Sequence, residues 1–207
     1  MFYIGRSSNG RTEAFEAFNL GSIPSLPAME YYIIFAGIIE QGFANRLLNA
    51  INNAHVAKAN KIILLLSSLG GNIQEGFTLA SVIQNSRIPV SIHATNNIDS
   101  IANVIYLSAK ERTAESYAKF YMHGATTAGT FDTKGLKEQM LSLKTENTRI
   151  AYFVSENCNL NLQKVQSMME AGTTMTAQEA LQHGIVQTIN HIEVPQGASR
   201  EDITIIN

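Results

Sequence analysis

The sequence predicts an α/β fold in which parallel strands alternate with covering helices. The first observation is a set of four apolar runs that begin at Tyr31, Lys61, Pro89 and Lys119, spaced by 30, 28 and 30 residues. A strand, a crossover helix and their loops occupy roughly 30 residues, so this spacing is typical of parallel βα units. The second observation is that the segments between these runs carry apolar residues at helical spacing.

The alternation of strands and helices is clearest between residues 31 and 93. Residues 31–36 and 61–66 are almost continuously apolar, which is typical of strands buried on both faces. Residues 41–59 repeat apolar side chains every three or four positions and predict an amphipathic helix. Asn72 is suited to cap a second helix. A third strand is predicted at residues 89–93.

The second half contains the longest predicted helix, at about residues 132–157, with Asp132 as its N-cap. This helix is too long for a four-stranded sheet to cover, so we expect it to project and to present its apolar stripe to another subunit. A shorter helix is predicted at 161–170. The segment Thr176–Glu179 matches a capping box that opens a further helix.

One folded domain is predicted over residues 31–195, with a last strand at 185–189. An irregular arm precedes it at residues 1–30, where glycines and prolines interrupt every period. The polar segment 196–207 is predicted to be a flexible tail.

Composition argues against several classes of protein. The net charge of −2, with no basic stripe, gives no reason to expect a nucleic-acid or membrane partner. Charged residues make up only 15% of the chain, against about 25% in typical domains, which suggests a surface partly covered by other subunits. The single cysteine and the scattered histidines predict neither a metal site nor a cofactor. No signal peptide or spanning segment is visible, and a cytoplasmic location is expected.

Ser100 is the first candidate functional residue, and it has two interpretations. It follows a polar stretch at 96–99 and precedes an apolar run, so it is suited to cap a helix. The second interpretation is a nucleophile, which requires a base within reach and N–H groups for an oxyanion. His123, at the end of the fourth strand, is a candidate base. Gly70, after the second strand, lets backbone approach a ligand closely.

Four segments of the chain resemble motifs of the ClpP family, the proteolytic subunits of Clp ATP-dependent proteases. They come in the same order as in that family and at nearly the same spacing. They are Ser67–Gly71, Ser100, Tyr121–His123 and Thr176–Val186. The resemblance extends over residues 31–189. It implies the ClpP/crotonase fold of repeated ββα (crossed βα) units, with the long helix as a projecting handle.

The resemblance also implies a serine endopeptidase that works through an acyl-enzyme. Ser100 occupies the nucleophile position and His123 the general-base position. Gly70 and Ile101 stand where backbone N–H groups build the oxyanion hole.

Substrates and partners follow from the same resemblance. Unfolded or short peptides would bind as an added strand along Gly71, Asn72, Ile73 and Gly124. Family members form heptameric rings or double rings that enclose a chamber, and an AAA+ unfoldase docks on the ring. We therefore expect a homo-oligomer with a possible AAA+ partner.

The chain departs from the family where the aspartate of the triad is expected, because Gly172 stands there. Candidate replacements are Glu170 and Asp99, and Thr173 or a water molecule are further options. In a serine protease with a complete Ser-His-Asp triad, replacing the aspartate lowers kcat by roughly 10⁴, which corresponds to about 5 kcal/mol of activation free energy.

Three functions are therefore compatible with the sequence. The first is a ClpP-like peptidase with an altered triad that retains Ser100 and His123. The second is a catalytically weak or inactive ring subunit with a structural or regulatory role. The third is an acyl-CoA enzyme of the crotonase type, against which the Ser100–His123 pairing and the short chain argue.

Overall fold

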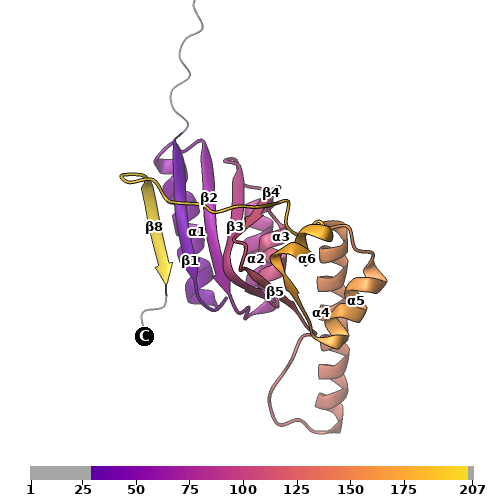
Figure 1. Cartoon of the computed structure of the whole chain (residues 1–207). Coiled ribbons are helices and arrows are strands. Elements are labelled where there is room, and N and C mark those ends of the chain that lie inside the picture. Colours follow the sequence, from indigo (N-terminus) through magenta and orange to yellow (C-terminus); the bar gives the residue numbers. More distant parts are fainter. Residues whose placement is uncertain (1–28, 205–207) are drawn as a thin grey trace, which may run out of the picture.

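The computed structural model describes residues 29–204, in which helices pack around a twisted sheet (Figure 1). The strands of the sheet are β1 (Glu30–Ala36), β2 (Lys61–Ser68), β3 (Val90–Asp99), β4 (Glu111–Ala114), β5 (Lys119–Met122), β6 (Thr173–Thr176), β7 (Thr188–Ile189) and β8 (Ser199–Thr204). The helices are α1 (Gln41–Val56), α2 (Ile73–Gln84), α3 (Ala102–Leu107), α4 (Thr133–Glu156), α5 (Leu162–Ala171) and α6 (Ala177–Gln182).

The sheet runs in the order β6-β5-β3-β2-β1-β8, and every neighbouring pair is parallel except β5 and β6. The parallel arrangement predicted for β1, β2, β3 and β5 is therefore confirmed. Strand β3 is shared, because Ser91–Ala94 pair with β4 and Asn97–Asp99 pair with β5. This fork brings the ends of β3 and β5 side by side, where Ser100 and His123 follow them.

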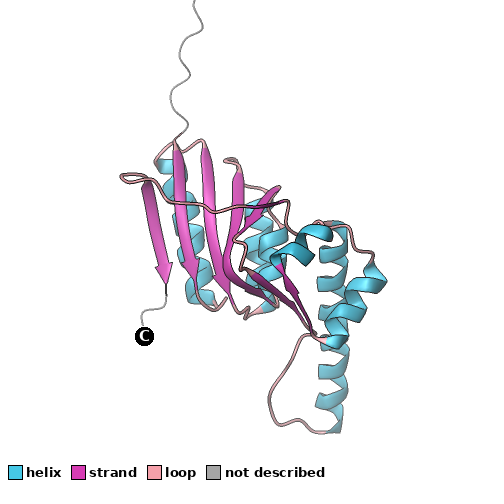
Figure 2. Cartoon of the chain, viewed as in Figure 1, coloured by secondary structure: helices cyan, strands magenta, loops and turns pink. Residues whose placement is uncertain are grey.

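The two faces of the sheet are covered differently. Helices α1, α2 and α3 lie against one face, and the main core forms there (Figure 2). On the other face Tyr32, Ile63 and Leu65 form a smaller cluster. It is covered by Ile192 and Val194, on the strap that leads from β7 to β8. The strap thus buries apolar side chains that a parallel sheet exposes on its second face.

Several sequence predictions need correction. The tail predicted to be flexible at 196–207 instead contributes β8, which pairs with β1 along Ser199–Thr204. Strand β3 continues to Asp99, through residues interpreted as a polar loop. Strands β4 and β6 were not predicted, and the last predicted strand shrinks to β7. The predicted arm at 1–30 lies almost wholly outside the described residues.

Helix α4 projects as predicted (Figure 1). The Asp132 side chain caps it by accepting a 2.7 Å hydrogen bond from the Gly135 N–H. Its buried side chains all lie in its last two turns. The first half is exposed and still carries large apolar side chains, at Leu136, Met140 and Leu141. A projecting apolar stripe of this kind is typical of a protein interface.

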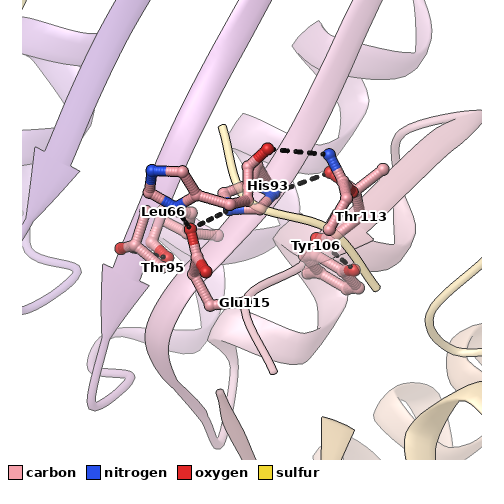
Figure 3. A network of polar contacts seen from close by, with 8 residues as sticks. Leu66, His93, Thr95, Tyr106, Thr113 and Glu115 are labelled. Carbon is pink, nitrogen blue, oxygen red and sulfur yellow. Dashed lines mark hydrogen bonds and ion pairs between the residues drawn. The ribbon is translucent and has the colours of Figure 1, made fainter. Parts of the chain in front are cut away.

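A buried polar network joins β3, β4 and the strap (Figure 3). His93 contacts the Thr113 hydroxyl through Nδ1 at 2.7 Å and Glu115 Oε1 through Nε2 at 3.3 Å. The same carboxylate oxygen lies 2.7 Å from Nδ1 of His191, at the start of the strap. Burial lowers the pKa of His93, although Glu115 favours its charged form. For Glu115, burial alone would raise the pKa, but hydrogen bonds from His191 and His93 outweigh it and lower the pKa.

This network makes the fold sensitive to acid. An unfolded chain takes up a proton at His93 as the pH falls through about 6.5, whereas the folded chain resists protonation there. The unfolded state then binds more protons, so the free energy of unfolding falls below that pH. Chemical denaturation between about pH 7 and pH 5 should show a smaller loss in His93→Gln than in the wild type. The control is His55→Gln on α1, outside the network. Equal losses in all three proteins would contradict the assignment.

Candidate active site

Ser100 lies in the turn between β3 and α3, in a conformation that few residues adopt. Its φ is +57°, in the left-handed region, where a side chain is strained. The turn is held by the Ser100 N–H, which donates to the Tyr121 carbonyl at 2.8 Å. The two N–H groups of Asn103 Nδ2 are shared among three acceptors, the carbonyls of Ile98, Ser100 and Tyr121 at 3.0–3.1 Å. The strain is thus fixed by the ends of two strands.

The capping interpretation of Ser100 is wrong. Helix α3 starts at Ala102, its N-cap position is Ile101, and no side chain caps it. The hydroxyl of Ser100 is therefore not occupied by the helix N-terminus. Backbone strain at a single non-glycine residue is typical of functional sites.

Gly70 packs directly against Ser100. A Cβ built on Gly70 would lie 2.6 Å from the Ser100 Cβ and 2.9 Å from the Asp99 carbonyl oxygen, and its φ of +91° also disfavours a side chain. The next residue, Gly71, would clash with the Ile39 backbone. Gly70 is therefore required for the loop after β2 to approach the serine, and Gly71 for the same loop to pack against Ile39.

The backbone N–H groups near Ser100 differ in their availability. The predicted donor Gly70 already donates to Ser68 Oγ at 3.1 Å. Among the described residues, none accepts from the N–H of Gly71 or of Ile101. The Ile101 N–H thus has no acceptor among the described residues, and neither has that of Gly71, whereas the Gly70 N–H is available only if the Ser68 side chain turns away.

His123 follows β5 and has a defined tautomer. Its Nδ1 lies 2.7 Å from the Gly124 carbonyl oxygen. A carbonyl only accepts, so Nδ1 carries the proton and Nε2 keeps its lone pair. One face of the imidazole stacks on the ring of Tyr121, with centroids 5.0 Å apart and planes 26° from parallel. This is the tautomer that a general base acting through Nε2 requires.

Ser100 and His123 line the same small cavity, although 23 residues separate them in the sequence. Its other walls are formed by residues of α3, β5, α4 and α5: Asn103, Met122, Ile150, Val154 and Met169. Its volume is about 10 Å³, close to the smallest space that holds a water molecule. No hydrogen bond joins Ser100 Oγ to His123 Nε2 in this arrangement, as is common in the absence of substrate.

Gly172 ends α5 in the left-handed conformation, with φ of +66°, and offers no acid. Glu170 is exposed and lies in the wall of a different cavity. Asp99 is buried, and its Oδ2 lies 3.8 Å from Lys119 Nζ. Burial raises the pKa of its carboxyl, and the charges of Lys119 and His123 partly oppose this. Asp99 is therefore within electrostatic range of the imidazole, but the atom that Nδ1 contacts is the Gly124 carbonyl.

The predicted substrate positions differ in exposure. Gly71 and Asn72 are exposed, and Ile73 is half-buried at the start of α2. The Asn72 side chain caps that helix through the Glu75 N–H at 3.1 Å. Gly124 lines a cavity of about 430 Å³ between α4 and α5. A larger cavity, of about 550 Å³, lies at the amino ends of β2 and β3 and is remote from Ser100.

Sequence reasoning missed three residues of the site. Asn103 supports the serine turn, and its only sequence signal is a polar residue inside an apolar run. Asn147 on α4 accepts a 2.6 Å hydrogen bond from the Ala125 N–H and fixes the chain after His123. Tyr121 stacks on the histidine. Within the described residues there is no cluster of metal-ligating side chains, and no helix there is long and apolar enough to cross a membrane.

Comparison with known proteins identifies the family. The Clp protease family model matches residues 23–193. The chain belongs to the Clp protease family. It is 24% identical over 168 residues to the ATP-dependent Clp protease proteolytic subunit 1 of Protochlamydia amoebophila, covering 78% of this chain and 81% of that protein. A proteolytic subunit from Streptococcus pneumoniae is 25% identical over 163 residues, covering 76% and 83%.

The fold is confirmed by a solved structure of a ClpP1 point mutant from Listeria monocytogenes. The superposition has a TM-score of 0.71 and covers 78% of this chain and 91% of that one, at 18% sequence identity. The Clp architecture predicted from four short motifs is therefore correct.

Removing the glycine beside Ser100 should disable the site. In Gly70→Ala the added Cβ meets Ser100, so we expect Ser100 to lose reactivity towards a fluorophosphonate by tenfold or more and the protein to lose about 1–3 kcal/mol of stability. Labelling rates and melting temperatures measure both effects.

The matched control is Gly42→Ala on α1, where a Cβ would meet nothing within 4 Å. It should label normally and gain about 0.5–1 kcal/mol, because alanine is the better helix former. A Gly70→Ala protein that matches this control in both measurements would contradict the assignment.

Proposed function

We propose that this chain is a ClpP-like serine endopeptidase subunit that cleaves unfolded or short peptides through an acyl-enzyme on Ser100. The observation that supports this best is the shared cavity of Ser100 and His123, with the Nε2 lone pair of His123 free. The strained turn of Ser100 and the unoccupied N–H groups of Gly71 and Ile101 support it further.

The chemistry follows from these atoms. Nε2 of His123 takes the proton of Ser100 Oγ as the oxygen attacks a peptide carbonyl. The N–H groups of Gly71 and Ile101 stabilise the resulting oxyanion. The C–N bond breaks as Nε2 returns the proton to the leaving amine. Water then attacks the ester, again with Nε2 as base, and releases the acid and Ser100.

The absence of a triad aspartate determines the turnover rate that we expect. The Gly124 carbonyl can hold the tautomer, but it carries no negative charge to balance the imidazolium. Losing the acid of a template triad costs roughly 10⁴ in kcat, so we expect slow turnover. The cavity beside Gly124 supports binding of one apolar side chain of the peptide, because Met140, Leu143 and Met169 line it.

We also propose that the subunit assembles into a ring or double ring in the cytoplasm, with an AAA+ unfoldase as a possible partner. The exposed apolar side chains of α4 support assembly. A heptameric ring would exclude folded proteins and limit cleavage to extended chains.

A catalytically inactive ring subunit is the second candidate. It is favoured by Gly172 and by the nearly filled cavity between Ser100 and His123. The two functions differ in whether Ser100 reacts. An acyl-CoA enzyme is the third, and an acyl-CoA that raises the melting temperature would favour it.

Fluorophosphonate labelling separates the first two candidates. We expect the assembled wild type to be labelled at Ser100, Ser100→Ala to be inert, and His123→Gln to react at least about tenfold more slowly, because the base is lost. Mass spectrometry locates the adduct. Ser142→Ala, on the exposed face of α4, should react like the wild type. No adduct in the assembled wild type would favour the inactive ring subunit.

Assembly is tested on α4. Leu136→Glu combined with Met140→Glu should dissociate the oligomer, because it introduces two charges into an apolar stripe that assembly would remove from water. Light scattering after size exclusion measures the mass. Lys134→Glu with Lys137→Glu is the control, since it adds negative charge to the same half of the helix. A monomeric wild type, or a double variant of unchanged mass, would contradict this role for α4.

A further inference from the structure

We propose that Tyr121 is the positioning residue for His123, with its ring against the imidazole and its hydroxyl in the space beside Gly172 where the family's acid is expected. This inference rests on the proposed function, because it concerns how the general base of that reaction is held. Tyr121 does not touch the reacting atoms. It acts through the histidine.

The strand geometry puts the two rings together. Side chains two positions apart in an extended chain point to the same side, so His123, just after β5, lies on the side of Tyr121 while Met122 enters the core. Their rings stack with centroids 5.0 Å apart. Tyr121 is also flanked by its pairing partners, Asp99 on β3 and Thr174 on β6. The ring is therefore half-buried between two strands.

Gly172 explains why the tyrosine fits. A Cβ built on Gly172 would lie 3.2 Å from the Tyr121 hydroxyl oxygen, and the next closest atoms are also in the Tyr121 ring. At this distance the tyrosine would have to shift by a few tenths of an ångström to admit a Cβ alone, and further to admit a carboxylate directed towards it. The glycine and the tyrosine are thus complementary, and the end of the tyrosine occupies the place of the absent side chain.

His123 needs such a support. Within residues 29–204 its one hydrogen bond, from Nδ1 to the Gly124 carbonyl, fixes a point on the imidazole but not the plane of the ring. The stacked tyrosine restricts that plane, so that Nε2 stays directed towards the cavity of Ser100. During acyl transfer the imidazole becomes positively charged, and the face of an aromatic ring attracts a cation. Tyr121 therefore has, more weakly, the two effects that the carboxylate of a triad has: it orients the imidazole, and it stabilises the positive charge that forms there.

The test compares three variants in the assembled protein: Tyr121→Phe, Tyr121→Leu and Tyr121→Ala. The first readout is fluorophosphonate labelling of Ser100, separated into the rate kinact and the affinity KI. We expect Phe to retain kinact within about threefold, because the ring is kept, and Leu and Ala to lose about tenfold or more at unchanged KI. Melting temperature and oligomer mass confirm that each variant is folded.

The second readout is the tautomer of His123, measured by ¹⁵N NMR of histidine-labelled protein. The wild type and Tyr121→Phe should show Nδ1 protonated, and Tyr121→Ala should show a mixture. This readout does not need hydrolysis. An unlabelled wild type would therefore defeat the proposed function, while the tautomer would still decide the role of Tyr121.

The close fit between Tyr121 and Gly172 gives a third readout. Gly172→Asp alone should lower kinact, because the carboxylate displaces the tyrosine. An aspartate tolerates the left-handed conformation, so Gly172→Asp should raise kinact when combined with Tyr121→Leu, relative to Tyr121→Leu alone. Equal kinact and an unchanged tautomer in Tyr121→Ala would overturn the proposal. So would a gain in kinact in the Gly172→Asp single variant.

Discussion

The side-chain amide of Asn103 is the interaction on which the whole site depends. Its Nδ2 donates to carbonyls at the end of β3, in the Ser100 turn and at the end of β5. Asn103 is only 2% exposed, so water has little access to its amide. The Tyr121 carbonyl also accepts from the Ser100 N–H, and the Ser100 carbonyl from the Asn103 N–H, so the amide reinforces bonds that the backbone already makes. The amide therefore joins the serine turn and the histidine strand into one unit.

This constraint explains why the strain at Ser100 persists. A left-handed serine costs of order 1–3 kcal/mol, which the hydrogen bonds of Asn103 and of the Ser100 N–H offset. The same turn leaves no space for a side chain at Gly70, since a Cβ there would meet Ser100. The serine, its anchoring amide and the facing glycine form one arrangement. A change at any of them alters the other two.

His123 is held by different groups from those that hold the histidine of a complete triad. In a complete triad a carboxylate orients the imidazole and balances its charge. Here a carbonyl fixes the tautomer, and an aromatic ring covers one face. The buried Asp99 adds negative charge near the imidazole without a hydrogen bond to it. The arrangement preserves orientation better than it preserves charge balance, so the peptidase that we propose is expected to turn over slowly.

Sequence periodicity was sufficient for the elements with strong apolar patterns. Strands β1 and β2 and helices α1, α2 and α4 were all predicted from such patterns. Strand β8 was missed because Ile203 is its only buried apolar side chain, and pairing with β1 decides its conformation.

The candidate site was predictable only in part. Motif order was enough to nominate Ser100, His123 and the paired glycines. It could not reveal the left-handed turn, because the bonds that hold Ser100 come from Asn103 and Tyr121. Nor could it reveal the contact between Tyr121 and Gly172, which depends on the antiparallel pairing of β5 with β6.

The most direct test is an experimental structure of the assembled protein with a phosphonate inhibitor. The account predicts a covalent bond from Ser100 Oγ to phosphorus, with His123 Nε2 at about 2.6–3.2 Å from Oγ or from an inhibitor oxygen. The inhibitor's oxyanion oxygen should accept from the N–H of Ile101 and of the glycine loop. An imidazole turned away from a serine that remains unmodified would contradict it.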